Sequence, residues 1–359
     1  MKIKEIKTVL VTGAGGLIGS EASKYFCELG CKVIGIDNNM RKKFFGEGGD
    51  VSKVIFSLTK EYSNFENFWI DIRNKRCIEN IIIQKQPDVI IHTAAQPSHD
   101  WAAREPITDF TINANGILIL LEAFRKYIKN PEKVFIHMST NKVYGDNPNK
   151  ANLIEKEKRY EYSENQEMKG ISLEGISEEM SLDNCVHSLF GVSKCAADLL
   201  AQEYGKYFNL NVGIFRGGCL TGPQHSAVEL HGYLAYIINC AVNKKLYKIF
   251  GYKGKQVRDQ IHSADVISAF VEFIKNPKKG EAYNLGGCKQ NSISILETID
   301  ILEKDFGLKL NYEYIDKNRV GDHICYYSDM SKFKKDYPNW KISRNVYQII
   351  EEIIKAKKK

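Results

Sequence analysis

A short apolar strand that leads into a glycine-rich turn and a helix constrains the fold more than any other segment. Val9-Leu10-Val11 is followed by Thr12-Gly13-Ala14-Gly15-Gly16-Leu17-Ile18-Gly19. Glycines at 13, 16 and 19 permit a tight turn, a close approach of backbone to a pyrophosphate, and close packing of the helix on the sheet. The first N–H groups of that helix, at Leu17 and Ile18, favour phosphate. The alternative is an ordinary tight turn in an α/β protein.

An acidic residue then follows a second strand at a diagnostic distance. The apolar run 32–36 ends at Asp37, 18 residues after Gly19. This is near the spacing of about 20 expected for an acid that binds the ribose 2′-hydroxyl. The carboxylate would repel a 2′-phosphate, so Asp37 and the adjacent Asn38 predict NAD as cofactor. Arg41 is close enough in sequence to keep NADP as an alternative.

Apolar strands alternate with amphipathic helices along the chain, which predicts a doubly wound parallel Rossmann sheet with helices on both faces. Three domain assignments follow. We expect an NAD-binding domain over 1–216, with the highly charged stretch 150–183 as a surface insertion, for which a lid is one interpretation. Residues 217–359 are expected to form mainly a smaller substrate-binding lobe, from which 255–275 return to the sheet. The remaining predicted elements are strands at 88–92, 134–138 and 212–216 and a helix at 113–127.

Composition narrows the class of protein. The chain has 359 residues, is 43% hydrophobic and carries a formal net charge of +7. No apolar run reaches 18 residues, and the N-terminus runs directly into the first strand, so neither a membrane span nor a signal peptide is expected. Nine cysteines without metal-ligand spacing predict reduced thiols in the cytoplasm and no metal site. No nucleic-acid motif accompanies the positive charge, which suits a nucleotide diphosphate or an ordinary basic surface.

Over nearly its whole length the chain resembles the extended short-chain dehydrogenase/reductase family. The glycine turn, Asp71-Ile72-Arg73, His92-Thr93-Ala94-Ala95-Gln96 and Met138 to Gly145 carry the resemblance. It implies that Asp71 and Ile72 contact the adenine and that Ala94, Ala95 and Gln96 lie beside the cofactor ribose. Asn113 matches the family's helix asparagine. The resemblance also implies a homodimer formed through the helices that contain Asn113 and Lys194.

The catalytic positions match the family except at one residue. Thr140 matches the catalytic hydroxyl, and Lys194 matches the lysine that holds the nicotinamide ribose. Phe190 stands where the family has a proton-carrying tyrosine, and phenylalanine has no hydroxyl. Three explanations remain open: another acid or base, an engineered change that traps substrate, or a protein that binds NAD and a sugar nucleotide without turnover. The candidate replacement groups are His187, Cys219, His225, Glu229 and Tyr327.

The resemblance also suggests a reaction. Related 4,6-dehydratases place an Asp-Glu pair after the catalytic hydroxyl, whereas this chain has Asn141-Lys142. Segments 139–146 and 254–262 resemble members that epimerise CDP-linked dideoxyhexoses at C2; another nucleotide-sugar 4-epimerase or reductase is the alternative. Ser98 to Trp101 could close over the sugar or pack as a loop. The expected substrate-binding residues are Gln96, Thr140, Asn141, Glu229, Gln256, Arg258, Arg319 and Asp322.

Overall fold

A computed structural model describes residues 2–225, 232–318 and 321–358. The chain divides into two compact units, each assembled from segments that are separate in sequence. The first unit contains Met1–Val143, Leu189–Arg216 and Val266–Tyr283; the second contains Tyr144–Ser188, Gly217–Asp265 and Asn284–Lys359. The chain passes from the first unit to the second after Arg216, at the predicted boundary, but residues 144–188, which are expected in the first domain, belong to the second unit.

The first unit is built on a seven-stranded sheet with the order β14-β10-β5-β4-β1-β2-β3. The pairs β1–β2, β1–β4, β2–β3 and β4–β5 are parallel. The predicted doubly wound α/β fold is therefore confirmed. Strand order reverses beside β1, and in such sheets ligands bind at the carboxyl ends of the strands where this reversal occurs. The strands are β1 (Thr8–Thr12), β2 (Lys32–Ile36), β3 (Phe65–Phe68), β4 (Val89–His92), β5 (Val134–Thr140), β10 (Asn211–Gly217) and β14 (Lys279–Leu285).

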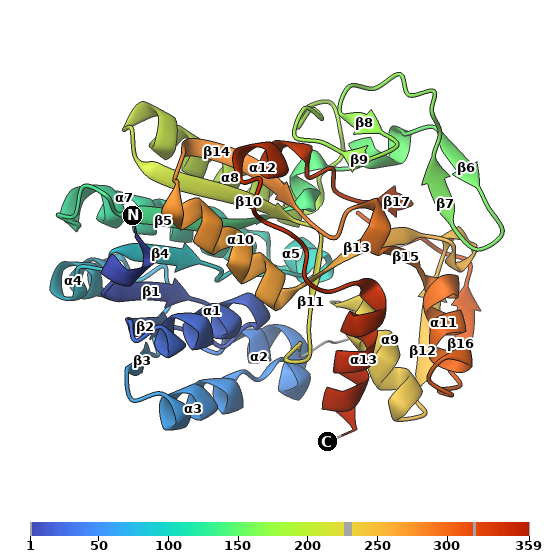
Figure 1. Cartoon of the computed structure of the whole chain (residues 1–359), viewed down its shortest axis with the longest axis horizontal. Helices are drawn as coiled ribbons and strands as arrows, with labels where there is room; N and C mark the ends of the chain where they lie inside the picture. Colours follow the sequence, from blue (N-terminus) through green and yellow to red (C-terminus); the bar gives the residue numbers. More distant parts are fainter. Residues whose placement is uncertain (1, 226–231, 319–320, 359) are drawn as a thin grey trace. The chain divides into compact units, whose positions relative to one another are not determined.

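Helices cover both faces of this sheet (Figure 1). On one face, α4, α7 and α8 pack into a core with Leu10 and Ile90. On the other face, Phe270 and Phe273 of α10 pack against Phe215 of β10, with ring centroids 4.9 and 5.7 Å apart. Burial on both faces explains the continuous apolar strands. The helices are α1 (Leu17–Glu28), α2 (Met40–Phe45), α3 (Ser52–Glu61), α4 (Lys75–Lys85), α5 (His99–Arg104), α6 (Pro106–Phe110), α7 (Gly116–Tyr127), α8 (Ser188–Tyr207) and α10 (Ser263–Lys275).

A π-helical turn, Thr111–Asn115, joins α6 to α7. The resulting helix, Pro106–Tyr127, is long and apolar enough to cross a membrane, but 56% of its most apolar window is buried inside the protein. Leu120 and Phe124 are fully buried in the core beneath the sheet. We therefore interpret this segment as a core helix.

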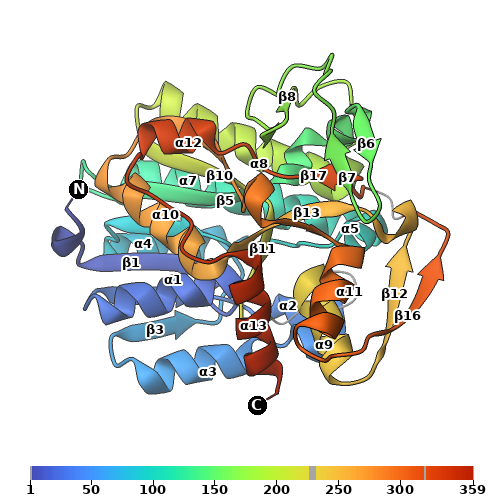
Figure 2. The same cartoon turned by 45° about the vertical axis from the view of Figure 1, so that its right-hand side comes forward.

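The second unit has its own sheet, in the order β11-β13-β15 with β17 beside β13. Because β13 pairs with these three strands, it stays in the second unit. After β13 the chain continues into α10 (Figure 2) and then into β14 of the first sheet (Figure 1). This return is later than the predicted 255–275. The strands are β11 (Cys219–Thr221), β12 (Leu246–Phe250), β13 (Val257–His262), β15 (Ser292–Ser294), β16 (Asn311–Ile315) and β17 (Cys325–Tyr326). The helices are α9 (Tyr233–Val242), α11 (Ile295–Lys304), α12 (Ser331–Asp336) and α13 (Val346–Lys357).

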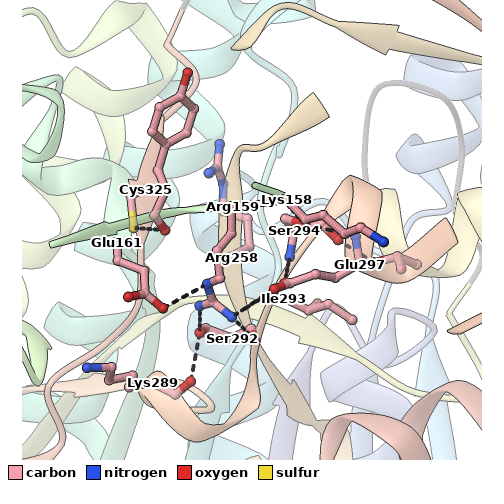
Figure 3. A network of polar contacts seen from close by, with 12 residues as sticks. Lys158, Arg159, Glu161, Arg258, Lys289, Ser292, Ile293, Ser294, Glu297 and Cys325 are labelled. Atoms are coloured by element: carbon pink, nitrogen blue, oxygen red, sulfur yellow. Dashed lines mark hydrogen bonds and ion pairs between the residues drawn. The ribbon is translucent and has the colours of Figure 1, made fainter. Parts of the chain in front are cut away.

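The stretch predicted as a surface insertion is tied to the second unit by a polar network (Figure 3). Arg159 donates to Ser292 Oγ at 2.5 Å and lies 3.4 Å from the Glu297 carboxylate. Ser294 Oγ donates to the Lys158 carbonyl oxygen at 2.7 Å. These contacts fix the base of the insertion against β15 and α11. Its strands are β6 (Leu153–Glu155), β7 (Tyr160–Tyr162), β8 (Ile171–Ser172) and β9 (Gly175–Ile176).

Candidate active site

The glycine turn joins β1 to α1 and leaves no room for side chains. Gly13 has a φ of +69°, and a Cβ there would lie 2.8 Å from the Ala94 backbone nitrogen. A Cβ at Gly19 would lie 2.0 Å from the Gly13 carbonyl oxygen. Gly16 precedes Leu17, the first residue of α1. The helix therefore begins directly at the turn, and its first N–H groups form the kind of cradle that a pyrophosphate needs.

Asp37 connects the end of β2 to this turn. One carboxylate oxygen accepts from the Gly15 N–H at 3.0 Å and the other from the Asn39 N–H at 2.8 Å. Burial raises the pKa of this carboxyl, and the backbone hydrogen bonds and Arg41 oppose the rise. Arg41 lies over the Phe45 ring at 4.9 Å. An acid held at the carboxyl end of β2 fits the ribose-binding position.

The expected adenine side of the site contains the polar residues Asn38 and Asp71, which contact each other, and the apolar residue Ile72. Asn38 donates its amide to Asp71 at 3.0 Å. Asp71 also pairs with Arg73 at 2.7 Å. Ile72 is buried and packs so closely on Gly116 that a Cβ there would lie 2.5 Å away from it. The turn after β3 is thus fixed against α7.

A buried hydrogen-bond network follows β4. The amide of Asn113 donates to the Gln96 carbonyl at 3.1 Å and to Asp109 at 3.1 Å, and its oxygen accepts from the Gln96 N–H at 2.9 Å. Gln96 donates its side-chain amide to Asp109 at 2.7 Å. Ser193 Oγ donates to the second Asp109 oxygen at 2.5 Å. Asn113 lies in the π-helical turn, a distortion common at functional sites. Ala94 and Ala95 precede the network and are half-buried.

Thr140 and Lys194 come together at the carboxyl end of β5. Thr140 is the last residue of that strand, and its Oγ accepts from the Lys142 N–H at 3.3 Å. Lys194 of α8 is buried and donates to the Met138 carbonyl oxygen at 3.0 Å. Burial lowers the pKa of Lys194 to about 8, although Asp198 and Asp109 oppose this effect.

Phe190 lies on α8 one turn before Lys194, so the two side chains share a helix face. Its ring is 6% exposed. The His99 ring packs against it edge-on, with centroids 4.8 Å apart and an interplanar angle of 64°. The position of the family tyrosine is therefore a packed site that lacks one oxygen atom.

His92 and His137, which the sequence favours as core residues, form neighbouring positions on β4 and β5. Both are 1% exposed, and their rings stack with centroids 5.3 Å apart. His92 Nδ1 lies 2.7 Å from Thr12 Oγ. Burial and the nearby Lys194 charge lower the pKa of His92 to about 3, so its ring is neutral near pH 7.

The second unit contains the residues expected to bind the sugar nucleotide. Arg258 of β13 is 7% exposed and pairs with Asp322 at 2.5 Å. Its guanidinium also donates to the Val257 carbonyl at 2.7 Å. Gln256 donates to the Phe250 carbonyl at 3.1 Å. Asp322 thus sets the orientation of the arginine fork. Glu229 and Arg319, both predicted substrate residues, lie outside the described residues.

The residues predicted to replace the tyrosine as base differ in their burial and in their contacts. Cys219 is half-buried on β11. His225 is 4% exposed, and its carbonyl accepts from Lys357 at 3.1 Å. Tyr327 is fully buried with its hydroxyl 3.4 Å from the Leu173 carbonyl, and burial raises its pKa. His187 lies 3.6 Å from the Cys185 sulfur. All four are in the second unit.

The sequence reasoning missed three contributors in the first unit: Asp109, Ser193 and the contact of His99 with Phe190. Asp109 precedes Asn113 by four residues, a spacing that could have indicated a shared helix face. Asn141, a predicted substrate residue, is 5% exposed next to Thr140. Among the described residues, no group of His, Cys, Asp and Glu could hold a metal ion.

Comparison with known proteins gives matches over most of the chain. Residues 9–286 match the family described as the NAD dependent epimerase/dehydratase family. CDP-paratose 2-epimerase of Salmonella typhi is 34% identical over 331 residues, covering 90% of this chain and 91% of that protein. UDP-glucuronate 4-epimerase of Thermodesulfobacterium geofontis is 27% identical over 335 residues, covering 92% and 90%.

A solved structure shows the same fold. UDP-glucuronic acid 4-epimerase from Bacillus cereus, in complex with UDP-glucuronic acid and NAD, has a TM-score of 0.77 and 25% identity. The similarity covers 98% of this chain and 99% of that one. A Tyr→Phe variant of the same enzyme, in complex with a fluorinated sugar nucleotide and NAD, gives the same TM-score and identity.

Proposed function

We propose that this chain, which belongs to the NAD dependent epimerase/dehydratase family, is a nucleotide-sugar epimerase whose leading reaction is C2 epimerisation of a CDP-linked dideoxyhexose. NAD is the cofactor of this family, and structural neighbours contain it. The observation that carries the proposal is the near-full-length 34% identity to a CDP-paratose 2-epimerase, joined to a glycine turn and a Thr140–Lys194 site that are both intact.

The first unit supplies the groups that would hold NAD. Gly13, Gly16 and Gly19 would leave backbone open to the pyrophosphate, and the N–H groups of Leu17 and Ile18 at the start of α1 would bind the anion. Asp37 would bind the adenine ribose, and Asn38 and Asp71 would border the adenine. Ala94, Ala95 and Gln96 would line the nicotinamide side, where the lysine would hold the second ribose. When bound, NAD supplies the reversible acceptor for the hydrogen and electron pair of a sugar C–H bond.

The chain's own groups would orient the sugar and handle its proton. Thr140 Oγ would hold the oxygen of the reacting carbon, and Asn141 would extend this contact. The side chain of Arg258, oriented by Asp322, would pair two oxygens of the diphosphate, as its planar fork allows. Gln256, Glu229 and Arg319 complete the proposed substrate set.

One sequence feature argues against the dehydratases that also resemble this chain. A dTDP-glucose 4,6-dehydratase of Escherichia coli is 28% identical over 345 residues. Elimination of water needs an acid after the catalytic hydroxyl, whereas the chain has Asn141 and Lys142 there. A different nucleotide-sugar 4-epimerase is the second candidate, favoured by the UDP-glucuronate 4-epimerase relative.

The test is conversion of a panel of CDP-, UDP- and GDP-sugars by the purified chain with NAD. Products would be identified by proton NMR, and the reduced nicotinamide would be followed by its absorbance. We expect CDP-paratose to give its C2 epimer. The C2 hydrogen should not exchange with solvent, because the hydrogen that is removed from C2 returns to it. Tight binding without product and without reduced nicotinamide across the panel would refute the enzyme proposal and leave the silent binder and the trapped variant as alternatives.

Two further properties belong to the same proposal. We propose a homodimer that buries the helices carrying Asn113 and Lys194. We also propose a cytoplasmic location, because all nine cysteines are free thiols in the structure, as expected in a reducing compartment.

A further inference from the structure

The proposed reaction needs a group that takes a proton from a sugar hydroxyl, and Phe190 cannot do so. Its ring is buried at the family tyrosine position on α8, one turn before Lys194. Any replacement must therefore reach the space at the edge of this ring. The candidates within the first unit are the side chains that pack on Phe190.

His99 meets the requirement. Its imidazole contacts the Phe190 ring edge-on, with centroids 4.8 Å apart, and the side chain is half-buried. An imidazole is the commonest general base in proteins because it exchanges protons near neutral pH. The contact places such a group against the side chain that stands at the family tyrosine position.

The surrounding structure holds His99 in place. It is the first residue of α5, and the Ser98 hydroxyl caps this helix by accepting from the Trp101 N–H at 3.2 Å. Trp101 is buried and its ring lies 4.5 Å from that of Phe44. The Gln96 side chain also accepts from the Ser98 N–H at 2.6 Å, which links α5 to the network around Asn113. A group fixed in this way can act without first being ordered.

The charged groups around Lys194 are compatible with a site that has no tyrosine. In the family a lysine ammonium stabilises the tyrosinate. Here Lys194 has two nearby carboxylates, Asp109 and Asp198. Asp198 is already paired with Arg216 at 2.8 Å, whereas the hydrogen bonds to Asp109 come from the neutral groups of Ser193, Gln96 and Asn113. The site thus keeps a buried carboxyl group near the lysine although the phenol is absent.

We propose that His99 is the catalytic residue that accepts and returns the sugar hydroxyl proton, in place of the tyrosine absent at 190. This inference rests on the proposed function. In the forward step the O–H bond breaks and its proton binds the neutral imidazole, while the C–H electron pair and hydrogen pass to NAD and a C=O bond forms. In the return step the imidazolium gives the proton back to the alkoxide as the C–H bond re-forms on the other face.

The experiment compares the parent with His99→Gln and with Arg104→Gln, an exposed residue at the other end of α5. Turnover of CDP-paratose would be measured with NAD saturating, and NAD affinity would be measured separately by calorimetry. We expect kcat to fall at least about 100-fold in His99→Gln, since general base catalysis contributes 10²–10⁴-fold. NAD affinity should change less than about threefold, and Arg104→Gln should behave as the parent.

Two further readouts separate a catalytic from a structural role. Diethyl pyrocarbonate should modify His99 in the parent, as read by peptide mass mapping, and NAD with CDP-paratose should slow that modification. Phe190→Tyr added to His99→Gln should restore turnover at least about tenfold, because the two positions serve the same proton. Retained turnover in His99→Gln, or an equal loss of NAD affinity, would overturn the proposal. A parent that converts no sugar of the panel would instead refute the proposed function.

Discussion

At the residue scale, a buried cation shapes the candidate active site. Lys194 is 4% exposed and is held by the Met138 carbonyl. Burial lowers the pKa of Lys194 to about 8, and burial raises the pKa of Asp109 despite its hydrogen bonds and the nearby ammonium. A buried ammonium or a buried carboxylate alone would lower the free energy of unfolding. The charged forms of Lys194 and Asp109 therefore depend on their mutual attraction. A lysine in this state is more readily deprotonated than an exposed one.

The Lys194 environment predicts how stability depends on pH. Between pH 8 and the ordinary value of 10.5, the unfolded chain binds more protons than the folded chain, so the free energy of unfolding rises with pH. Below pH 8 both states are protonated and the whole penalty applies. Relative to Lys194→Met, the parent should therefore gain up to about 3 kcal/mol across this window. Urea unfolding at several pH values would measure it.

The control for this pH dependence is Lys206→Met, at the exposed end of the same helix. Its difference from the parent should stay constant across the window. If Lys194→Met also differs from the parent by a constant amount, the ammonium is not destabilised by burial.

The glycine turn makes a second prediction at this scale. Gly13 and Gly30 both have positive φ, +69° and +81°, but a Cβ at Gly13 would meet the Ala94 backbone at 2.8 Å whereas Gly30 has nothing within 4 Å. Gly30→Ala should therefore cost only backbone strain, about 1 kcal/mol. Gly13→Ala should cost at least about 2 kcal/mol more and weaken NAD binding at least tenfold. Denaturant unfolding and NAD titration would show this, and equal effects of the two substitutions would contradict it.

At the element scale, the central strands were predictable and the edges were not. The strands at 9–11, 32–36, 88–92, 134–138 and 212–216 are apolar because both faces of the sheet are covered, and each matches a strand of the structure. The sheet-edge strand β14 has the mixed sequence Lys279–Leu285, which carries no such signal. For this reason the sequence placed the return of the chain at 255–275, whereas β13 in that range pairs with β11, β15 and β17 of the second unit.

The candidate site likewise contains residues that a single sequence can indicate and contacts that it cannot. The glycine turn, Asp37, Thr140 and Lys194 are local motifs with fixed spacing, so the sequence alone could predict them as site residues, and their roles stay a prediction. Asp109 and Ser193 are 84 residues apart, and their contact depends on how α6 and α8 pack. His99 and Phe190 are likewise distant in sequence. Contacts between side chains of separate helices leave no periodic trace, so a single sequence could not predict them.

The anchored insertion gives a prediction at this scale. Arg159 contacts Ser292 and Glu297, and its side chain is 18% exposed. Arg159→Ala should loosen β6 and β7 and speed proteolytic cleavage within 150–183 at least about fivefold, while the free energy of global unfolding falls by about 1–2 kcal/mol. The matched control is Lys169→Ala, because its pair with Glu179 is exposed and worth little. Equal cleavage rates in the two variants would refute the anchoring role.

At the scale of the whole molecule, an exposed apolar stripe on α8 bears on assembly. Leu189, Val192 and Leu199 are 48, 47 and 50% exposed, and Leu118 of α7 is 36% exposed. Exposed apolar residues that repeat along one helix indicate a candidate interaction surface. In a twofold dimer each residue of the interface is used twice, so one substitution places two charges in the contact.

Leu199→Glu should therefore convert a dimer into a monomer, whereas Ile83→Glu, on α4 with 46% exposure, should leave the dimer intact. Sedimentation at micromolar concentration would measure both, with unchanged circular dichroism as evidence of folding. A monomeric parent, or a dimeric Leu199→Glu variant, would refute the interface. Because α8 also carries Phe190 and Lys194, the NAD affinity of the monomer would show whether dimer contacts affect the cofactor site. Unchanged affinity would mean that each chain builds its cofactor site alone, and weaker affinity would mean that dimer contacts hold α8 in place.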